Sequence, residues 1–356
     1  MVKKFLIGFG IVAIILTITP YIPVDYWWIR MFDFPHTQLT MLTSIAILVY
    51  LIKFDVKNSK DYAFISVLIF CCGYQFVKIY PYTPLATVEV FDSSAESHQK
   101  LKIFTANVLQ ENEKSHLLIQ EIETLNPDII LLTEVNKRWL KSLHSTINKA
   151  YAFKYEIPLE NAYGMALYSK LELVNPTTKF LVADSIPSIH TKALLKSGDV
   201  IQLYAIHPTP PVPQENMMST DRDAEMMMVA KMSLASELPV IVFGDFNDVA
   251  WSVTSKLFAN VSGLLDARIG RGMFNTYSAR SYILKWPLDH IFISSEFRVQ
   301  KIEVRDDIFS DHYPLYTEFT YEPKKSSEQK PEAASAEDLA FANDQIENFL
   351  EQKKNN

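Results

Sequence analysis

Three apolar segments within the first 80 residues constrain the fold of this chain more than any other feature. They cover residues 5–24, 39–52 and 62–79, contain no Asp or Glu, and include Lys78 as their single charged residue. A helix needs about 17–25 apolar residues to cross a bilayer, and the second segment reaches this length when Thr37 and Gln38 are added. The sequence therefore predicts a membrane anchor over residues 1–80, with three transmembrane helices at about 5–24, 37–53 and 61–79.

A cleaved signal peptide is the alternative for the first segment, because Lys3 and Lys4 precede an apolar run. No small-x-small cleavage site follows, and two more apolar segments come directly after. Three lysines lie within residues 53–61, whereas residues 25–36 hold one Arg against two Asp. By the positive-inside rule the N-terminus and the 53–61 loop are cytoplasmic. We therefore expect a multi-pass protein of the cell (inner) membrane whose remaining residues lie on the extracytoplasmic side.

Cysteine usage and charge narrow the function classes. The two cysteines, Cys71 and Cys72, are adjacent in the third apolar segment, where packing or lipid contact explains them better than a disulfide. The formal net charge is −7, and the acidic excess extends over residues 97–322. A broad basic face for tight binding of duplex DNA is therefore not evident.

The rest of the chain divides into three parts. Residues 81–99 combine Pro, Ser and Thr without periodicity, which predicts a linker. Residues 100–322 alternate short β-rich runs with helical patterns, expected at 115–125 and 220–234, which indicates a layered α/β domain. Residues 323–356 are charged and rich in Ala and Ser, which predicts a disordered tail with at most a marginal helix over 338–353.

Polar side chains stand where the predicted strands begin or end. Sites in layered α/β proteins are commonly built from loops at strand ends, so these side chains are expected to converge. They are Asn107, Glu134, His207, Asp245, Asn247, Asp289, Asp311 and His312. The set combines carboxylates, amides and imidazoles, which suits holding a divalent cation and moving a proton.

The order of these residues resembles the endonuclease/exonuclease/phosphatase superfamily, which includes deoxyribonuclease I. The resemblance covers about residues 100–321 and rests on Gly244-Asp245-Phe246-Asn247 followed by Ser310-Asp311-His312-Tyr313-Pro314. The three apolar segments in front are similar to a bacterial membrane-anchored branch of this superfamily. The resemblance implies a four-layer sandwich, with two packed β-sheets flanked by helices, and hydrolysis of phosphate esters with Mg²⁺ or Mn²⁺.

Roles for the individual residues also follow from the resemblance. Glu134 would bind the metal, with Asn107 and Asp311 completing or supporting its ligand shell. Asp289 would orient His312, which either deprotonates the attacking water or binds a phosphoryl oxygen. Asp245 would handle the other proton. His207 and Asn247 would donate hydrogen bonds to the phosphate.

Each of these residues also has an explanation without function. Glu134 could be a solvated surface carboxylate, Asn107 and Asn247 could be turn residues, and His207 could be packed on an edge strand. The ordered occurrence of the whole set favours the catalytic interpretation. The chain departs from deoxyribonuclease I at residues 162–169, which offer no carboxylate to orient His207.

Arg222 and His290 lie near these residues in the sequence but are not part of the predicted set. Arg222, in the first turn of the expected helix 220–234, is either exposed or a phosphate contact. His290 follows Asp289 in a strand and therefore points to the opposite face, outside the site.

The sequence thus predicts a membrane-anchored, metal-dependent phosphohydrolase. A phosphodiesterase is expected, with nucleic acid or a lipid headgroup as the phosphate-ester substrate, and no protein partner is predicted. The alternatives are a catalytically silent module that binds a phosphorylated ligand and a phosphomonoesterase.

Overall fold

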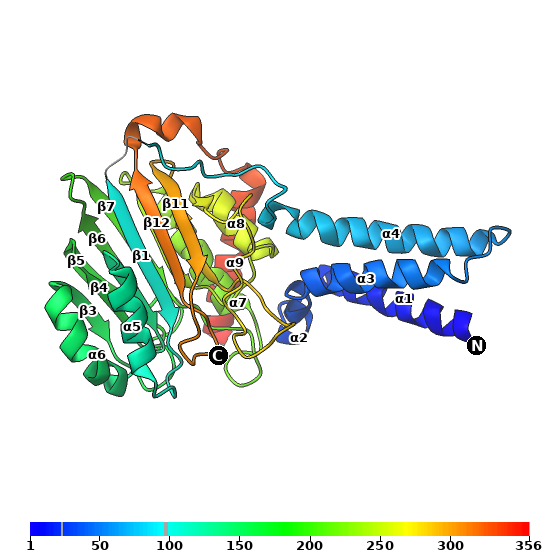
Figure 1. Cartoon of the computed structure of the whole chain (residues 1–356), viewed down its shortest axis with the longest axis horizontal. Coiled ribbons are helices and arrows are strands. Elements are labelled where there is room, and N and C mark those ends of the chain that lie inside the picture. Colours follow the sequence, from blue (N-terminus) through cyan, green and yellow to red (C-terminus); the bar gives the residue numbers. More distant parts are fainter. Residues whose placement is uncertain (23, 96–98, 356) are drawn as a thin grey trace.

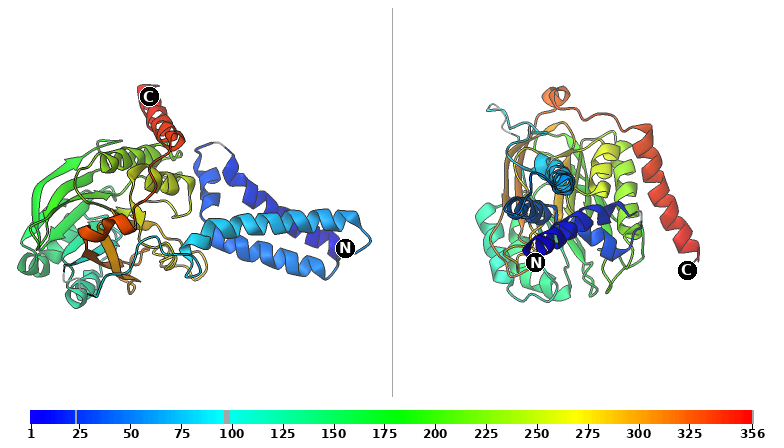
Figure 2. Two further views of the ribbon diagram at one scale, coloured as in Figure 1. Left: turned by 90° about the horizontal axis from the view of Figure 1, so that it is seen from above. Right: turned by 90° about the vertical axis from the view of Figure 1, so that its right-hand side faces the viewer.

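The chain consists of a helical arm joined to a layered α/β domain (Figure 1). The computed structural model describes residues 1–22, 24–95 and 99–355. The arm contains α1 (Val2–Ile18), α2 (Trp27–Arg30), α3 (His36–Leu51) and α4 (Ser59–Ile79), with the 3-10 turns η1 (Thr19–Tyr21), η2 (Met31–Asp33) and η3 (Tyr80–Tyr82). In two views α1, α3 and α4 extend away from the domain, whereas α2 lies at the base of the arm (Figures 1 and 2).

Two helices in the described part of the chain are long and apolar enough to cross a membrane, Val2–Tyr21 and Ser59–Tyr82. The span predicted at 37–53 falls on α3, which has 16 residues and is too short by itself. It qualifies only together with Trp27–Asp33, from which it is bent by 70°. Three spans are therefore not confirmed. Apolar side chains such as Leu48 and Phe70 are exposed on the arm, so protein packing does not cover its outer surface.

Two six-stranded sheets form the centre of the domain, and each contains one parallel pair among antiparallel neighbours. The first sheet has the order β11-β12-β1-β2-β4-β3: β1 Lys100–Asn107, β2 Ile129–Thr133, β3 Phe153–Ile157, β4 Met165–Ser169, β11 Phe297–Val304 and β12 Leu315–Tyr321. The second has the order β5-β6-β7-β8-β10-β9: β5 Glu172–Lys179, β6 Ser188–Leu194, β7 Val200–Ile206, β8 Val240–Asp245, β9 Leu265–Asp266 and β10 Asp289–Ile293.

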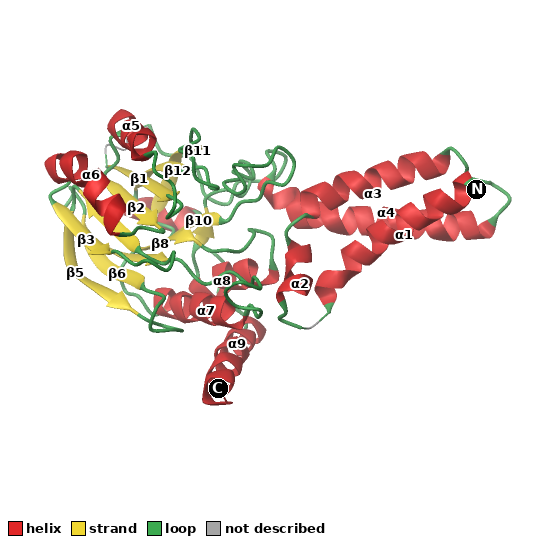
Figure 3. Cartoon of the chain, turned by 90° about the horizontal axis from the view of Figure 1, so that it is seen from below, coloured by secondary structure: helices red, strands yellow, loops and turns green. Residues whose placement is uncertain are grey.

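Helices cover the outer face of each sheet, which gives four layers (Figure 3). α5 (Ser115–Leu125) and α6 (Lys137–Ala150) pack on the first sheet, and α7 (Thr220–Leu234) and α8 (Val253–Ser262) cover the second. α9 (Ala336–Asn355) packs on the outside of α7 and α8. β2 is apolar from Ile129 to Leu132, as expected for a strand with both faces buried. Ile129 and Leu131 face the core between the sheets, whereas Ile130 and Leu132 face the helices. The predicted four-layer sandwich is confirmed.

The predicted linker 81–99 is packed against the domain along much of its length, although residues 96–98 lie outside the described part. Val90 is fully buried in the core between the sheets. The hydroxyl of Tyr82 donates a hydrogen bond to the carbonyl oxygen of Ala250 at 2.6 Å. The segment therefore fixes the arm to the domain.

The expectation of a disordered tail is wrong for the described residues. Residues 323–328 form the 3-10 turn η4 (Pro323–Glu328), and α9 packs along α7 and α8. Ala342 and Phe349 are buried, and Leu339 and Ile346 are partly buried on the same side. Because these apolar residues recur at spacings of three and four, they form one stripe that the charged composition obscures.

Replacing Phe349 by Ala should detach α9 locally, because this side chain fills a buried contact with Val182 and Ala224. We expect the free energy for opening α9 to fall by about 2–4 kcal/mol. Hydrogen exchange of the amides in residues 336–355 of the full chain measures it. Phe341 is 43% exposed on the same helix, so Phe341→Ala is the matched control and should change exchange little. Equal acceleration in both variants would contradict this packing.

Candidate active site

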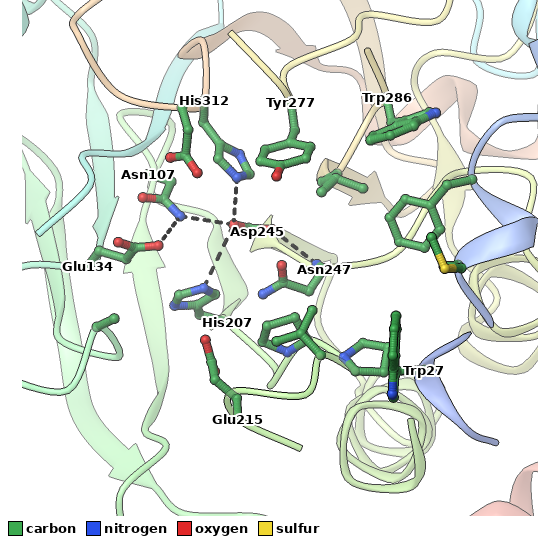
Figure 4. A pocket seen from close by; sticks show the side chains of 18 of the residues that line it. Trp27, Asn107, Glu134, His207, Glu215, Asp245, Asn247, Tyr277, Trp286 and His312 are labelled. Atoms are coloured by element: carbon green, nitrogen blue, oxygen red, sulfur yellow. Dashed lines mark hydrogen bonds and ion pairs between the residues drawn. The ribbon is translucent and has the colours of Figure 1, made fainter. Parts of the chain in front are cut away.

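All eight predicted site residues lie at one edge of the two sheets. Parallel pairing of β1 with β2, and of β7 with β8, brings the ends of these four strands to the same edge. β10 begins there because it is antiparallel to β8, with Asp289 directly opposite Asp245. A pocket of about 470 Å³ opens at this edge (Figure 4). Seven of the eight residues line it, and Asp289 lies behind His312.

Asp245 is the centre of the hydrogen-bond network in Figure 4. Its Oδ2 accepts a hydrogen bond from Asn107 Nδ2 at 3.1 Å, and its Oδ1 accepts one from the backbone N–H of Asn247 at 3.0 Å. Asn107 Nδ2 also donates to Glu134 Oε1 at 2.7 Å. One amide therefore joins two carboxylates that come from different sheets. Burial raises the pKa of Glu134 to about 7, against the lowering effect of the Asn107 hydrogen bond.

His312 lies in contact with Asp289, the partner expected for it from the sequence. Its Nδ1 lies 2.8 Å from Asp289 Oδ2, and its Nε2 lies 3.5 Å from Asp245 Oδ2. Burial alone would lower the pKa of this imidazole. The negative charges of Asp245 and Asp289 outweigh burial, and they raise the pKa to about 10. His312 is therefore cationic at neutral pH.

His207 faces the same carboxylate in a different environment. Its Nε2 lies 3.7 Å from Asp245 Oδ2, and its ring packs against Tyr163 with 5.2 Å between centroids. Its Nδ1 is buried and has no hydrogen-bond partner in the described part of the chain. Burial lowers the pKa of His207, and Asp245 only partly opposes this. The second imidazole therefore favours the neutral form, and no carboxylate among the described residues orients it through Nδ1.

The turn after β8 is supported from behind by a buried guanidinium. Arg222 is 2% exposed, forms ion pairs with Asp223 and Asp248, and donates a hydrogen bond to the carbonyl oxygen of Asn247 at 3.0 Å. The sequence suggests that Arg222 is either exposed or a phosphate contact, and both expectations are wrong, because Arg222 is buried and does not line the pocket. His290 points away from the pocket as predicted, and its Nε2 lies 2.8 Å from the carbonyl oxygen of Asp248.

Three residues at or next to the site have backbone conformations with positive φ. Gly244 has φ 142°, and a Cβ there would stand 2.1 Å from the carbonyl oxygen of Ile206, so β7 and β8 approach as closely as glycine allows. Glu134 has φ 62° and Asn247 has φ 51°, which are left-handed values that cost most residues about 1 kcal/mol. Strain of this kind clusters at functional sites.

Several lining residues are not in the set of eight predicted above, although Tyr277 lies in a segment whose position before Asp289 suggests a substrate-selecting loop. Tyr277 packs against His312 with 5.0 Å between ring centroids, and the hydroxyl of Tyr163 donates a hydrogen bond to Glu215. Trp27 comes from α2, in the arm. Tyr277 stands in the segment before Asp289, but no local pattern marks Tyr163, Glu215 or Trp27, because they reach the pocket only through tertiary packing.

The charges of the pocket fit a cation. The residues that line it include four carboxylates and no Lys or Arg: the carboxylates are Glu134, Glu215, Asp245 and Asp311. Burial is the largest cause of the raised pKa of Glu134, and the negative charge of Asp311 raises it further. The two carboxylates are therefore close enough to interact electrostatically. A second possible ligand group is Asp245, Asp289 and His312, whose ligand atoms all lie within 4.8 Å of one another. Hard divalent cations prefer oxygen ligands, so the four carboxylates that line the pocket suit Mg²⁺ or Mn²⁺.

Comparison with known proteins agrees with this geometry. A family model described as "Endonuclease/Exonuclease/phosphatase family" matches residues 104–312. TDP2 of D. rerio, solved with a single strand DNA product, superposes with a TM-score of 0.53 at 16% identity, covering 62% of this chain and 99% of that one. The human nocturnin catalytic domain gives a TM-score of 0.50 at 20% identity, covering 62% and 94%. A family protein from Bacteroides thetaiotaomicron gives 0.50 at 18% identity, covering 63% and 98%. Curated protein sequences gave no match.

The left-handed backbone at Glu134 predicts an inverted order of stability between two variants. In regular structure Ala is more stable than Gly by about 0.5–1 kcal/mol. At φ 62° a Cβ is strained, so Glu134→Gly should be more stable than Glu134→Ala by about 1 kcal/mol. Urea unfolding of the full chain in detergent measures the difference. The usual order, with Ala the more stable, would show that this conformation is wrong.

Proposed function

Because this chain belongs to the endonuclease/exonuclease/phosphatase family, we propose that it is a membrane-anchored phosphodiesterase that depends on a divalent metal. Members of this family are generally metal-dependent phosphoester hydrolases. The observation that carries the proposal is the meeting of Asn107, Glu134, Asp245 and His312 around one pocket whose lining contains no Lys or Arg. A phosphate bound there needs positive charge from a metal and from the imidazolium.

Glu134 and Asp311 are proposed as the metal ligands, with Asn107 holding the Glu134 carboxylate in place. The alternative group with Asp289 and His312 is a poorer choice, because Nδ1 of His312 and Oδ2 of Asp289 already engage each other at 2.8 Å. When bound, Mg²⁺ or Mn²⁺ offsets the charge of the phosphate and orients it.

The remaining residues have roles that follow from their contacts. Asp245 takes a proton from the attacking water, whose oxygen bonds to phosphorus while the bond from phosphorus to the leaving oxygen breaks. The leaving oxygen takes a proton from a solvent water, and Asp245 returns the proton it holds to solvent, so that the net reaction consumes one water. His312, fixed by Asp289 and cationic, donates from Nε2 to a phosphoryl oxygen as charge builds there. His207 donates a hydrogen bond to the phosphate, as does the amide N–H of Asn247 that is not bonded to Pro208.

Hydrolysis of bis(4-nitrophenyl) phosphate by the purified full chain in detergent tests the proposal. Mg²⁺ should support turnover and a chelator should abolish it. His312→Ala and Glu134→Gln should each lower kcat by about 10²–10⁴-fold, because each removes charge or a contact needed in the transition state. His116 is an exposed histidine on α5, so His116→Ala is the matched control and should keep the wild-type rate.

Equal rates in the wild type and in His312→Ala would leave the silent binding module as the function of this fold. Faster release from 4-nitrophenyl phosphate than from the diester would instead assign the chain to the phosphomonoesterases.

The proposed location is the cell (inner) membrane, with three spans and the domain on the extracytoplasmic side. The lysines at 53–61 and the two apolar helices support this topology. Alkaline phosphatase, which is active only outside the cytoplasm, should be active when fused after Asn355 and inactive when inserted in the 53–57 loop. Activity of the loop fusion alone would reverse the orientation.

A further inference from the structure

The pocket has two chemically different ends. The polar end holds Glu134, Asp245 and His312, as described above. The other end is apolar, and its wall contains Trp27, Met31, Phe34 and Trp286. Figure 4 shows Trp27 and Trp286 across the pocket from Glu134. A volume of about 470 Å³ is that of a small-molecule pocket, and a single phosphate occupies only its polar end.

Much of the apolar wall belongs to the arm. Trp27 and Met31 lie in the α2–η2 segment, Trp27–Asp33, between the first candidate span and α3. Hydrogen bonds fix this segment to the domain: the backbone N–H of Trp27 donates to the Met217 carbonyl at 2.8 Å, and Trp251 Nε1 donates to the Asp33 carbonyl at 2.8 Å. The ring of Phe34 meets that of Trp286 edge to face at 5.6 Å. The pocket is therefore closed on one side by the membrane anchor itself.

A loop of the domain exposes apolar side chains at the same place. Tyr282 is fully exposed and Ile283 is 75% exposed, at the tip of the loop between Tyr277 and Trp286. Gln38, in the first turn of α3, donates a hydrogen bond from Nε2 to the Ile283 carbonyl at 2.8 Å. Domain loops gather at the base of the arm in Figure 3. Aromatic and apolar side chains beside an emerging membrane helix are typical of the bilayer interface.

We propose that the substrate is a membrane lipid with a phosphodiester headgroup, whose apolar part lies along Trp27, Met31 and Phe34 while its phosphate occupies the polar end. This rests on the phosphohydrolase activity proposed above. The wall is continuous with the membrane anchor, so a lipid reaches the pocket from the bilayer surface beside the exposed loop. Nucleic acid fits less well, because a polynucleotide backbone is tracked by a basic groove and the pocket lining contains no Lys or Arg.

A chromogenic series separates the apolar contact from the chemistry. The full chain in lipid nanodiscs with Mg²⁺ is assayed on 4-nitrophenyl butyl phosphate, 4-nitrophenyl octyl phosphate and thymidine 5′-(4-nitrophenyl phosphate). These diesters share one leaving group. For the wild type, kcat/KM should be about ten- to a hundredfold higher for octyl than for butyl, mainly through KM, because each buried methylene contributes favourable binding. The thymidine diester should be the poorer substrate.

Trp27→Ala should reduce the octyl-to-butyl ratio about tenfold. Trp28 is the matched control: it is the next residue, has the same side chain, is 48% exposed, and does not line the pocket. Trp28→Ala should keep the ratio, which also controls for partition of the octyl diester into the bilayer.

The outcomes separate the two proposals. Three results would overturn the lipid substrate and leave the proposed phosphodiesterase activity in place. They are an equal fall of the octyl-to-butyl ratio in Trp27→Ala and Trp28→Ala, equal rates on the butyl and octyl diesters in the wild type, or a higher kcat/KM for the thymidine diester. Turnover of none of the diesters above the His312→Ala level would overturn the activity, and the lipid substrate with it.

Discussion

The hydrogen bond from Asn107 to Asp245 is the contact on which the rest of the site depends. It joins the end of β1 in one sheet to the end of β8 in the other, and it is almost fully buried. Because Asn107 also donates to Glu134, one amide sets the relative positions of two carboxylates. Gly244 makes the arrangement possible, since any Cβ there would collide with the Ile206 carbonyl and separate β8 from β7.

The carboxylates around this contact would repel one another without compensation from the protein. His312 supplies one positive charge, and Asp289 holds that imidazole from behind. Arg222 carries a second positive charge nearby, but its guanidinium is paired with Asp223 and Asp248 beneath the turn and does not line the pocket. The pocket itself therefore keeps an excess of negative charge. A divalent cation would balance this charge better than a lysine, because a metal ion can also coordinate oxygens of the substrate.

The convergence of the polar residues could be predicted from the sequence, for a physical reason, whereas their catalytic roles stay predictions. Asn107, Asp245 and Asp289 terminate or begin strands with clear apolar patterns, so their place in the chain determines their place at the sheet edge. The partner of His207 could not be predicted in this way. Tyr163 reaches it only through the packing of a loop, and no spacing in the sequence encodes that contact. The composition of the tail predicts disorder, but the recurrence of Leu339, Ala342, Ile346 and Phe349 at spacings of three and four forms an apolar stripe that packs on the domain.

The apolar helices of the arm could be predicted from the sequence, but their contribution to the pocket could not. Hydropathy describes how a segment partitions between water and lipid, and it contains no information on which face of the domain the segment will meet. The backbone hydrogen bonds of Trp27 and Asp33 to the domain fix which face of the domain the arm contacts. Phe34 and Ile79 of the arm pack in one cluster with Trp286 and Leu288, so removing the arm would uncover these side chains and open one side of the pocket. The apolar arm is therefore part of the structure that shapes the pocket, in addition to the membrane attachment that we propose for it.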